Sequence, residues 1–389
     1  MEISDNLTIL VDFEDAFTSY SGIPTAILND TLCLVLAKFE VILWYSDDSK
    51  TQKILSWMDK YLEKNEKSRV RLLATRPSNF KMWLYQVTPC LIKQKIACDF
   101  SIAHLFPRLP IKGSQHSILR IYDPFGSHRN SIVTLCDSLL KGDSIKNAFA
   151  RMIRTYSFST LNDSNLVKIY ISEFTQRICN NIYRDKRDGD FVIFPTVQFA
   201  LPALKQQPKI NVTFSSSKPY FILLGGQRQR KDPLSIVKVW ADNLNLCDFD
   251  LVVVGNIDES LLSQNVKDAR ERGRLRFMSG LSIDDLRSCI ENSIGVVFNS
   301  HGEGFGFPIA EGIYLKKPVV CNNLEIFKEV GGYYPYFFES GEYDEALAIL
   351  LQISRGTLGA KSNLTKSFAM SESIRIWKES LLARREEAL

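Results

Sequence analysis

A glycine-rich turn between two carboxylates carries the strongest chemical signal in this sequence. The stretch from His301 to Glu311 reads HGEGFGFPIAE, and it places Glu303 and Glu311 eight positions apart. The apolar run 293–298 before it predicts a buried parallel strand, and Pro308 suits the first turn of a helix. The turn therefore joins the carboxyl end of a strand to the start of a helix, where backbone amides and the helix dipole favour anions.

The residues inside this turn indicate what the anion belongs to. Gly302, Gly304 and Gly306 have no Cβ, so the backbone can approach a ligand closely and offer its N–H groups. Glu303 and Glu311 are placed to accept hydrogen bonds from hydroxyl groups of a sugar or a ribose. The pattern therefore predicts a site for a phosphorylated sugar.

A second strand, turn and helix lies earlier in the chain. The apolar run 220–224 leads into Gly225 and Gly226, and Arg230 and Lys231 follow just before a helical pattern. Arginine offers a fork of donors and lysine a point charge, which together suit a pyrophosphate. A basic cluster on a loop is more often a solvated surface, but its place before the glutamate pair favours a binding role.

These motifs together resemble a known family. Glu303 and Glu311, with Gly-Phe-Gly-Phe-Pro between them and Lys-Pro-Val-Val at 317–320 afterwards, are similar to the donor-site signature of the retaining GT-B glycosyltransferases of family 4. The resemblance implies an α/β fold of two Rossmann-like domains, each with a doubly wound parallel sheet, that face each other across a cleft. The alternative is a glycine-rich turn in another α/β protein, with both glutamates merely solvated.

The resemblance also implies roles for particular residues. Arg230 and Lys231 would clamp the diphosphate of a nucleotide sugar, Glu303 would contact hydroxyl groups of the donor sugar, and Glu311 would hold the ribose. The motif Gly-x-x-x-x-Arg-Lys-Asn of mannose-transferring members is similar here, although Asp232 stands where asparagine is usual. The further donor-site residues that we infer are Gly225, Gly226, Gly255, Leu281, Gly304, Phe305, Gly306 and Phe307. For Gly255, a plain strand-ending glycine is an equal alternative.

The first half departs from the family at one place. Many relatives carry a His-Asp pair after a strand that corresponds to residues 117–121, and here the pair is Tyr122-Asp123. Three alternatives keep the chain active: Tyr122 bonds the same sugar hydroxyl, His128 takes over that contact, or the donor differs. Loss of catalysis is the fourth. Asp123 is equally compatible with a strand-end cap.

Acceptor-side residues are less well determined. His104 fits packed core and acceptor cleft equally well, and Gly22 lies in the loop after the first predicted strand. We predict an acceptor-side domain at 1–200, a linker at 201–219, a donor-binding domain at 220–372 and a terminal helix at 373–389 that packs back on the first domain. Further strands are predicted at 7–12, 41–45, 70–73, 117–122, 167–171, 191–195, 250–254 and 275–278.

Composition limits the other classes of function. The chain is 45% hydrophobic and 24% charged with a net charge of +4, which indicates a soluble globular protein and is too small a charge to predict nucleic-acid binding. No signal core and no apolar run of membrane-spanning length is present, so we expect a cytoplasmic protein. The eight cysteines form no C-x-x-C pair, so we expect reduced thiols and no cysteine-bound metal. Metal-independent donor binding follows, with Arg230 and Lys231 in place of a cation.

A basic stretch indicates one more partner. Residues 50–95 contain eleven Lys or Arg against three Asp or Glu, interleaved with aromatic residues such as Trp57 and Tyr61. Peripheral contact with an anionic membrane is one explanation. A solvated basic helix whose aromatic residues lie in the core is the other.

Two hypotheses on function follow. In the first, the chain moves a hexose, with mannose favoured, from a nucleotide-diphosphate sugar to a glycan or lipid-linked acceptor during polysaccharide or glycolipid assembly, lipopolysaccharide included. Retention of anomeric configuration is implied by the resemblance alone. In the second, the chain is a catalytically silent GT-B protein that binds a nucleotide sugar or glycan beside another glycosyltransferase.

Overall fold

The chain forms two compact units. The computed structural model describes residues 7–17, 22–78, 81–82, 94–104, 109, 111–122, 139–140, 145, 148–149, 152–153, 155–156, 166–183, 190–197, 218–226, 230–362 and 368–386. The first unit comprises Met1–Thr196 and Met370–Leu389, and the second comprises Val197–Ala369. The predicted linker 201–219 lies outside the described residues except for its last two positions.

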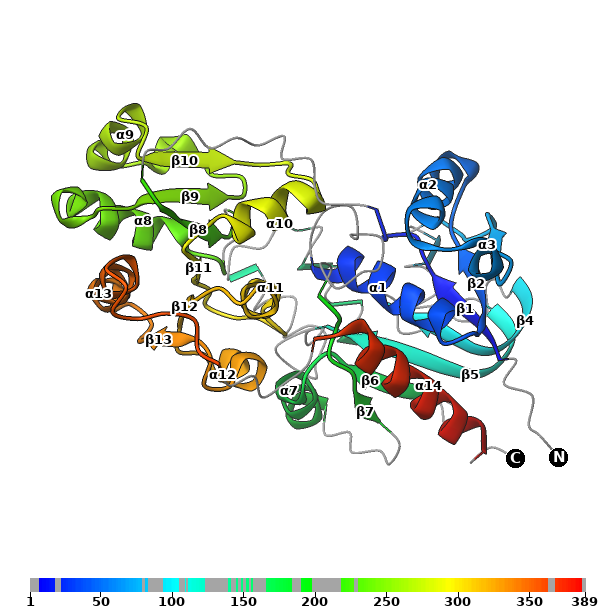
Figure 1. Ribbon diagram of the computed structural model, residues 1–389. Coiled ribbons are helices and arrows are strands. Elements are labelled where there is room, and N and C mark those ends of the chain that lie inside the picture. The colour runs from blue at the N-terminus through cyan, green and yellow to red at the C-terminus, as the bar shows by residue number, and fades with distance from the viewer. Residues whose placement is uncertain are drawn as a thin grey trace. The chain divides into compact units, whose positions relative to one another are not determined.

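A seven-stranded, all-parallel sheet forms the centre of the first unit (Figure 1), in the order β3-β2-β1-β4-β5-β6-β7. Strands β1 and β2 are buried along their whole length except for the first residue of each, as expected for a parallel sheet that is covered on both sides. The strands are β1 Thr8–Asp12, β2 Glu40–Trp44, β3 Val70–Leu73, β4 Gln94–Ala103, β5 Ile111–Ile121, β6 Leu166–Tyr170 and β7 Phe191–Val192. The helices with described bounds are α1 Gly22–Leu36, α2 Thr51–Tyr61, α3 Lys64–Lys67, α7 Glu173–Tyr183 and α14 Met370–Glu386, with the 3-10 turn η1 Asp48–Lys50.

Strand β4 was missing from the predicted strands, yet it pairs with β1 on one side and β5 on the other. Its first half alternates between exposed and buried residues, and only its last four residues are all buried. No continuous apolar run therefore marks it in the sequence. Its position matters because the order of the sheet reverses between β1 and β4, and because His104 follows its last residue.

One buried arginine ties the terminal helix into the first unit. Arg120, on β5, has a fully buried side chain and pairs through Nε with Asp30 of α1 at 3.0 Å. It also donates to the carbonyl oxygens of Tyr170 and Ile193, at 3.1 and 2.7 Å. Trp377 of α14 donates its indole N–H to the other oxygen of Asp30 at 3.4 Å. The strands, α1 and α14 thus share one polar cluster inside the core.

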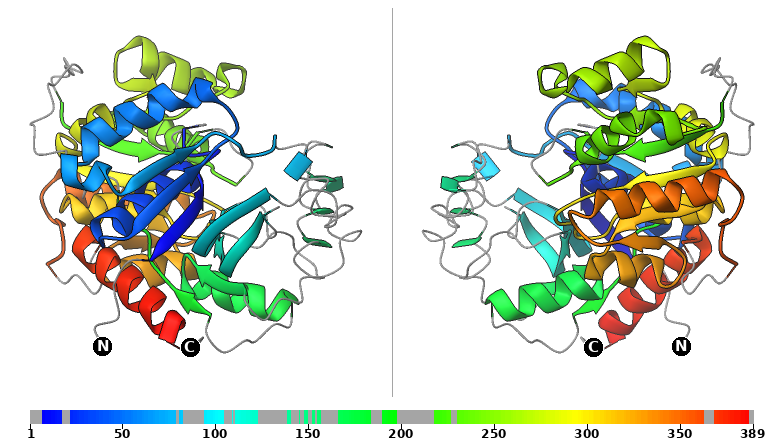
Figure 2. Two further views of the ribbon diagram at one scale, coloured as in Figure 1. Left: turned by 90° about the vertical axis from the view of Figure 1, so that its right-hand side faces the viewer. Right: turned by 90° about the vertical axis from the view of Figure 1, so that its left-hand side faces the viewer.

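Helix α14 has a second polar contact with the same unit. Ser373 accepts a hydrogen bond of 2.7 Å from the hydroxyl of Thr196, whose carbonyl accepts one of 2.7 Å from the amide of Asn29. Figure 2 shows α14, in red, beside the elements of the first unit from both sides. The last helix of the chain is therefore part of the first unit.

The aromatic residues of α2 lie in the core. Trp57 and Tyr61 are 6% and 8% exposed, and the ring of Trp57 lies 5.6 Å from that of Phe13. These two aromatic side chains are thus unavailable for contact with a membrane, and the structure supports the core explanation for them. Trp83 and Tyr85 lie outside the described residues. No helix in the described part of the chain is both long and apolar enough to cross a bilayer.

A six-stranded, all-parallel sheet forms the second unit, in the order β10-β9-β8-β11-β12-β13. The strands are β8 Tyr220–Leu224, β9 Asp250–Val254, β10 Leu275–Met278, β11 Gly295–Phe298, β12 Val319–Asn322 and β13 Tyr336–Phe338. The helices are α8 Pro233–Asp242, α9 Gln264–Glu271, α10 Ile283–Glu291, α11 Phe307–Tyr314, α12 Glu325–Gly331 and α13 Tyr343–Ser354, with 3-10 turns η4 Leu244–Leu246 and η5 Glu259–Leu261.

Helices cover both faces of this second sheet. Residues of α8, α9 and α13 pack in one cluster with alternate residues of the strands, such as Phe221 and Leu223. On the other face, α11 approaches so closely that a Cβ on Gly312 would lie 2.7 Å from Val319. The sheet is therefore doubly wound, and its order reverses between β8 and β11.

The six described cysteines of the whole chain are all buried.

We expect loss of Arg120 to destabilise the first unit. Arg120→Met leaves the Asp30 carboxyl buried without its ionic partner, which costs about 3–5 kcal/mol of unfolding free energy at pH 7. Burial already raises the pKa of Asp30 and Arg120 opposes that rise. Without Arg120 the folded state binds a proton that the unfolded state releases, so the loss of stability grows as the pH rises from 5 to 7. Urea unfolding at both pH values measures this.

The matched control is Arg375→Met, on helix α14 of the same unit. The Arg375 side chain is 54% exposed and pairs with Glu372 and Glu379 at the surface. We expect a change within about 1 kcal/mol, because exposed ion pairs contribute little. Equal losses in the two variants would contradict the assigned role of Arg120.

Candidate functional site

The candidate site lies where the order of the second sheet reverses. Ligands of doubly wound sheets bind at the carboxyl ends of the strands on either side of such a reversal, here β8 and β11. The loop after β8 carries Arg230 and Lys231, and the loop after β11 carries Glu303. A β-bridge between Lys231 and Ser300 joins the two loops directly. The two sequence motifs therefore meet in space.

Arg230 and Glu303 contact each other. Nη1 of Arg230 lies 2.6 Å from Oε2 of Glu303 and donates to the carbonyl of Gly302 at 3.1 Å. The arginine side chain is 41% exposed and the glutamate side chain 9%. A partly exposed arginine side chain thus lies beside a nearly buried glutamate side chain.

Ser300 connects the two partners. Its buried hydroxyl lies 3.2 Å from Oε1 of Glu303 and 3.0 Å from the carbonyl oxygen of Arg230. The N–H of His301 donates to that same carbonyl at 2.6 Å. These contacts hold the backbone of the basic loop against the glycine-rich loop. They also fix the Glu303 carboxylate next to both loops.

Asn322, the last residue of β12, holds Ser300 in turn. Its side-chain oxygen accepts from the N–H of Ser300 at 3.1 Å, and its amide donates to the carbonyl of Ser300 at 2.8 Å. Asn322 is fully buried. Neither Ser300 nor Asn322 was among the predicted site residues. The available signal was a polar residue within two positions after a buried apolar run.

Lys231 and Glu311 interact electrostatically in the site. Glu311 lies one turn into α11 and is 8% exposed. Burial raises the pKa of its carboxyl to about 7, and the positive charge of Lys231 opposes the rise. The ammonium of Lys231 also lies 5.2 Å from the centre of the Phe298 ring. Glu311 is therefore a buried carboxyl that titrates near neutral pH and faces a cation.

Asp232, the residue that departs from the usual asparagine, has a structural explanation. It is the N-cap of α8, where its carboxylate accepts from the N–H of Ser235 at 3.2 Å. The hydroxyl of Tyr343 donates to it at 2.9 Å. Asparagine and aspartate cap helices about equally well, so this difference leaves the start of α8 intact.

Close backbone contact explains Gly255, and a left-handed backbone explains Gly306. A Cβ on Gly255, whose φ is +148°, would lie 2.5 Å from the N and Cα atoms of Gly226. Only glycine therefore lets the loops after β8 and β9 touch. Gly306 is the left-handed residue before α11, with φ of 99°. A Cβ on Gly225 would meet only the Lys231 side chain, at 3.7 Å.

The remaining donor-site predictions fall around the same edge of the sheet. Phe305 is 2% exposed, and its ring lies 5.3 Å from that of Phe307. These two aromatic rings contact each other across the end of the glycine-rich loop, and Gly304 lies within that loop. Leu281 follows Gly280 in the loop between β10 and α10, and it is partly buried.

Predicted acceptor-side residues lie in the first unit, where two of them contact each other. Nδ1 of His104, after β4, lies 2.7 Å from the hydroxyl of Tyr122, after β5. Burial and the nearby Arg120 lower the pKa of His104 to about 3, and burial raises the pKa of Tyr122, so both are neutral. Nε2 of His104 is buried without a hydrogen-bond partner. Gly22 begins α1.

Two predicted residues, Asp123 and His128, lie outside the described residues.

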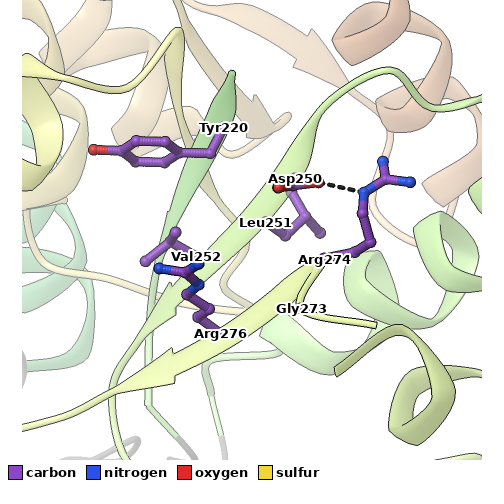
Figure 3. Close-up of a pocket in the computed structure, with 7 residues that line it drawn as sticks. All are labelled: Tyr220, Asp250, Leu251, Val252, Gly273, Arg274 and Arg276. Atoms are coloured by element: carbon purple, nitrogen blue, oxygen red, sulfur yellow. Dashed lines mark hydrogen bonds and ion pairs between the residues drawn. The ribbon is translucent and has the colours of Figure 1, made fainter. Parts of the chain in front are cut away.

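A small hollow of the second unit lies at the other end of its sheet. It is lined by Tyr220, Asp250 and Arg274, which stand at the starts of β8 to β10 (Figure 3). Arg274 is paired with Asp250 and donates to two carbonyl oxygens. Because five residues of β8 span roughly 16 Å, this hollow is remote from Arg230 and Glu303, and its main charges are already paired.

Part of the chain is similar to a known protein family. Residues 205–355 match the family Glycosyl transferases group 1. A curated relative, the O-antigen chain mannosyltransferase RfbU of Salmonella typhimurium, is 30% identical over 115 residues, which is 28% of this chain and 31% of that protein. The chain thus matches less than a third of this relative's length.

Solved structures share the fold across nearly the whole chain. The structure of WaaG, a glycosyltransferase involved in lipopolysaccharide biosynthesis, matches with a TM-score of 0.55 and 11% sequence identity. The match covers 98% of this chain and 98% of WaaG. TarM from S. aureus, in complex with UDP and other ligands, has a TM-score of 0.60 at 10% identity, with 98% of this chain and 99% of TarM covered. The predicted fold class, GT-B with two parallel-sheet α/β domains, is confirmed.

We expect Gly255→Ala to destabilise the second unit by about 1–3 kcal/mol, since both a strained φ and a backbone clash must be relieved. Gly302→Ala is the matched control, because a Cβ there meets nothing within 4 Å. It should change the unfolding free energy by less than about 0.5 kcal/mol. Urea unfolding of the two variants compares them, and a Gly255→Ala variant as stable as Gly302→Ala would contradict the close loop contact.

Proposed function

We propose that this chain is a glycosyltransferase that moves a hexose, with mannose favoured, from a nucleotide-diphosphate sugar to a glycan or lipid-linked acceptor. The observation that carries the proposal is the meeting of Arg230 with Glu303, beside Lys231 and Glu311, at the reversal of the second sheet. Two cations and two carboxylates there suit a diphosphate flanked by two hydroxyl-bearing rings. The mannosyltransferase relative and the lipopolysaccharide-related structure support polysaccharide or lipopolysaccharide assembly as the setting.

The residues would share the work as follows. Arg230 and Lys231 bind the diphosphate, Glu303 accepts hydrogen bonds from the sugar, and Glu311 accepts them from the ribose. In a retaining transfer, the acceptor oxygen bonds to the anomeric carbon on the face that the diphosphate leaves. The departing phosphate oxygen takes the acceptor's proton, so no protein nucleophile is needed. Arg230 and Lys231 stabilise the charge that develops on the leaving group.

Donor binding in this proposal is independent of a metal ion. A diphosphate needs compensating positive charge, and Arg230, Lys231 and the amino end of α11 can provide it. The partial exposure of the Arg230 side chain supports this assignment.

Tyr122 and His104 are proposed to serve the reaction from the first unit. Tyr122 stands where family members carry a histidine, and its hydroxyl is held by the neutral ring of His104. A neutral phenol can donate to or accept from a hydroxyl group, as a neutral imidazole can. We propose that the chain acts in the cytoplasm, with peripheral contact at an anionic membrane when the acceptor is lipid-linked.

A silent GT-B partner of another enzyme is the second candidate, because Tyr122 replaces the family's histidine. The two candidates differ for Glu303→Ala. Under the first, transfer falls by at least about 100-fold, comparable to loss of one strong charge-stabilising or positioning group. Under the second, the unsubstituted chain already transfers nothing.

Our first prediction for the donor site uses thermal unfolding with GDP-, UDP-, ADP- and dTDP-sugars. One series should stabilise the chain, by about 2.7 kcal/mol at 100 times its dissociation constant. Lys231→Ala should remove most of this shift, whereas Lys238→Ala, an exposed lysine on α8, should leave it unchanged. Absence of a shift with every nucleotide sugar would contradict the proposal.

A second prediction concerns pH. Ribose hydroxyls bond best to the ionised Glu311, whose pKa is about 7 in the unliganded chain. Donor affinity should therefore rise from pH 6 to pH 8, by up to about tenfold if only the ionised form binds. The raised pKa also means that ionisation of Glu311 lowers the stability of the unliganded chain as pH rises toward 7. Isothermal titration measures the affinity, and Glu311→Gln should bind more weakly and without this pH dependence. An unchanged dependence in that variant would assign it to another group.

A further inference from the structure

Two of the charged groups proposed to bind the donor, Arg230 and Glu303, form an ion pair with each other in this structure. Nη1 of Arg230 contacts Oε2 of Glu303, and Oε1 of Glu303 faces the hydroxyl of Ser300. The oxygen proposed to accept from the donor sugar is thus already engaged by the cation proposed to bind the diphosphate. Either the donor joins this pair or it replaces one of its partners.

The strengths of the competing contacts favour replacement. The Arg230 side chain is 41% exposed, and partly solvated ion pairs are weak because water competes for both charges. A diphosphate carries more charge than one carboxylate and offers the arginine fork two parallel oxygens, the stronger arrangement. Arg230 also uses only Nη1 in its contacts with Glu303 and Gly302, so the pair is not the bidentate kind.

Ser300 determines what happens to Glu303 after such an exchange. Its hydroxyl is fully buried, and its backbone is fixed in both directions by Asn322. That hydroxyl has one proton and three acceptors within 3.2 Å, namely Glu303 and the carbonyl oxygens of Arg230 and Gly302. When Arg230 turns away, Ser300 remains in place to hold Oε1, and Oε2 becomes free.

We propose that donor binding exchanges partners at this site and that Ser300 is the positioning residue for it. The diphosphate takes Arg230 from Glu303, and Ser300 then orients the released carboxylate toward the sugar. Glu303 therefore recognises the sugar only when a diphosphate is bound. This inference rests on the proposed function, and it adds an order of events that the function alone does not require.

The test measures binding of inorganic pyrophosphate to the full chain by isothermal titration, because this probe needs neither the base nor the sugar to be known. Glu303→Gln should bind pyrophosphate about two- to fivefold more tightly than the unsubstituted chain, as expected from loss of a weak competing ion pair. In the Arg230→Gln background, Glu303→Gln should leave the pyrophosphate affinity unchanged, because no guanidinium remains for Glu303 to release.

Asp232→Asn is the matched control. It removes a negative charge from the same loop and keeps the cap of α8, but Asp232 has no contact with Arg230 among those of the described residues. Its effect on pyrophosphate affinity should be equal, within about twofold, with and without Arg230. If Glu303→Gln also tightened pyrophosphate binding in the Arg230→Gln background, the effect would come from the removal of a negative charge alone. That result would overturn the exchange.

The other outcomes separate the two proposals. Binding of pyrophosphate that is unchanged or weaker in Glu303→Gln would overturn the exchange and leave the donor site standing. Absence of binding in the unsubstituted chain and in Glu303→Gln alike would overturn the proposed function and the exchange with it.

Ser300→Ala tests the positioning role. Its pyrophosphate affinity should stay within about twofold of the unsubstituted value, since Arg230 and Lys231 remain. The extra affinity of the nucleotide sugar over its nucleoside diphosphate should be lost, as in Glu303→Gln. A loss of pyrophosphate binding in Ser300→Ala would indicate a merely structural role for Ser300 and overturn the assignment.

Discussion

The site depends on one topological constraint, the reversal of strand order between β8 and β11. Two neighbouring parallel strands whose chains leave in opposite directions open a gap above their carboxyl ends, and each can send a loop into it. Here the loops touch through the bridge between Lys231 and Ser300. Every charged group of the site, from Arg230 to Glu311, is positioned relative to that contact.

The constraint is maintained by residues that carry no net charge. Ser300 and Asn322 are fully buried, and they join the ends of β11 and β12 to the basic loop. Glycine serves the same end where side chains cannot fit, as in the contact of Gly255 with Gly226. A buried polar framework of this kind holds the backbone of the partly exposed Arg230 at a defined place, as the proposed exchange of partners requires.

The first unit is organised around a buried ion pair instead. Arg120 and Asp30 lie beneath the carboxyl end of β5, and Trp377 bonds the same carboxylate. Tyr122 lies next to Arg120, with the centre of its ring 5.9 Å from the guanidinium carbon. The hydroxyl of Tyr122 is hydrogen-bonded to His104. The terminal helix is thus linked through two side chains to the pair of residues proposed to face the sugar.

The sequence by itself determined the local units and their chemistry. Apolar runs such as 220–224 and the proline at 308 report on neighbouring residues only, so strand, turn and helix could be predicted there, and with them Glu303, Glu311, Arg230 and Lys231. Strand β4 escaped prediction because only its last residues are buried throughout. Tertiary structure alone decided which strands are neighbours. It therefore decided that Asn322 bonds Ser300 and Ser300 bonds Glu303, that Lys231 acts on the buried Glu311, and that His104 contacts Tyr122. Such contacts join residues far apart in the chain, and their energies depend on burial, which no local pattern of residues records.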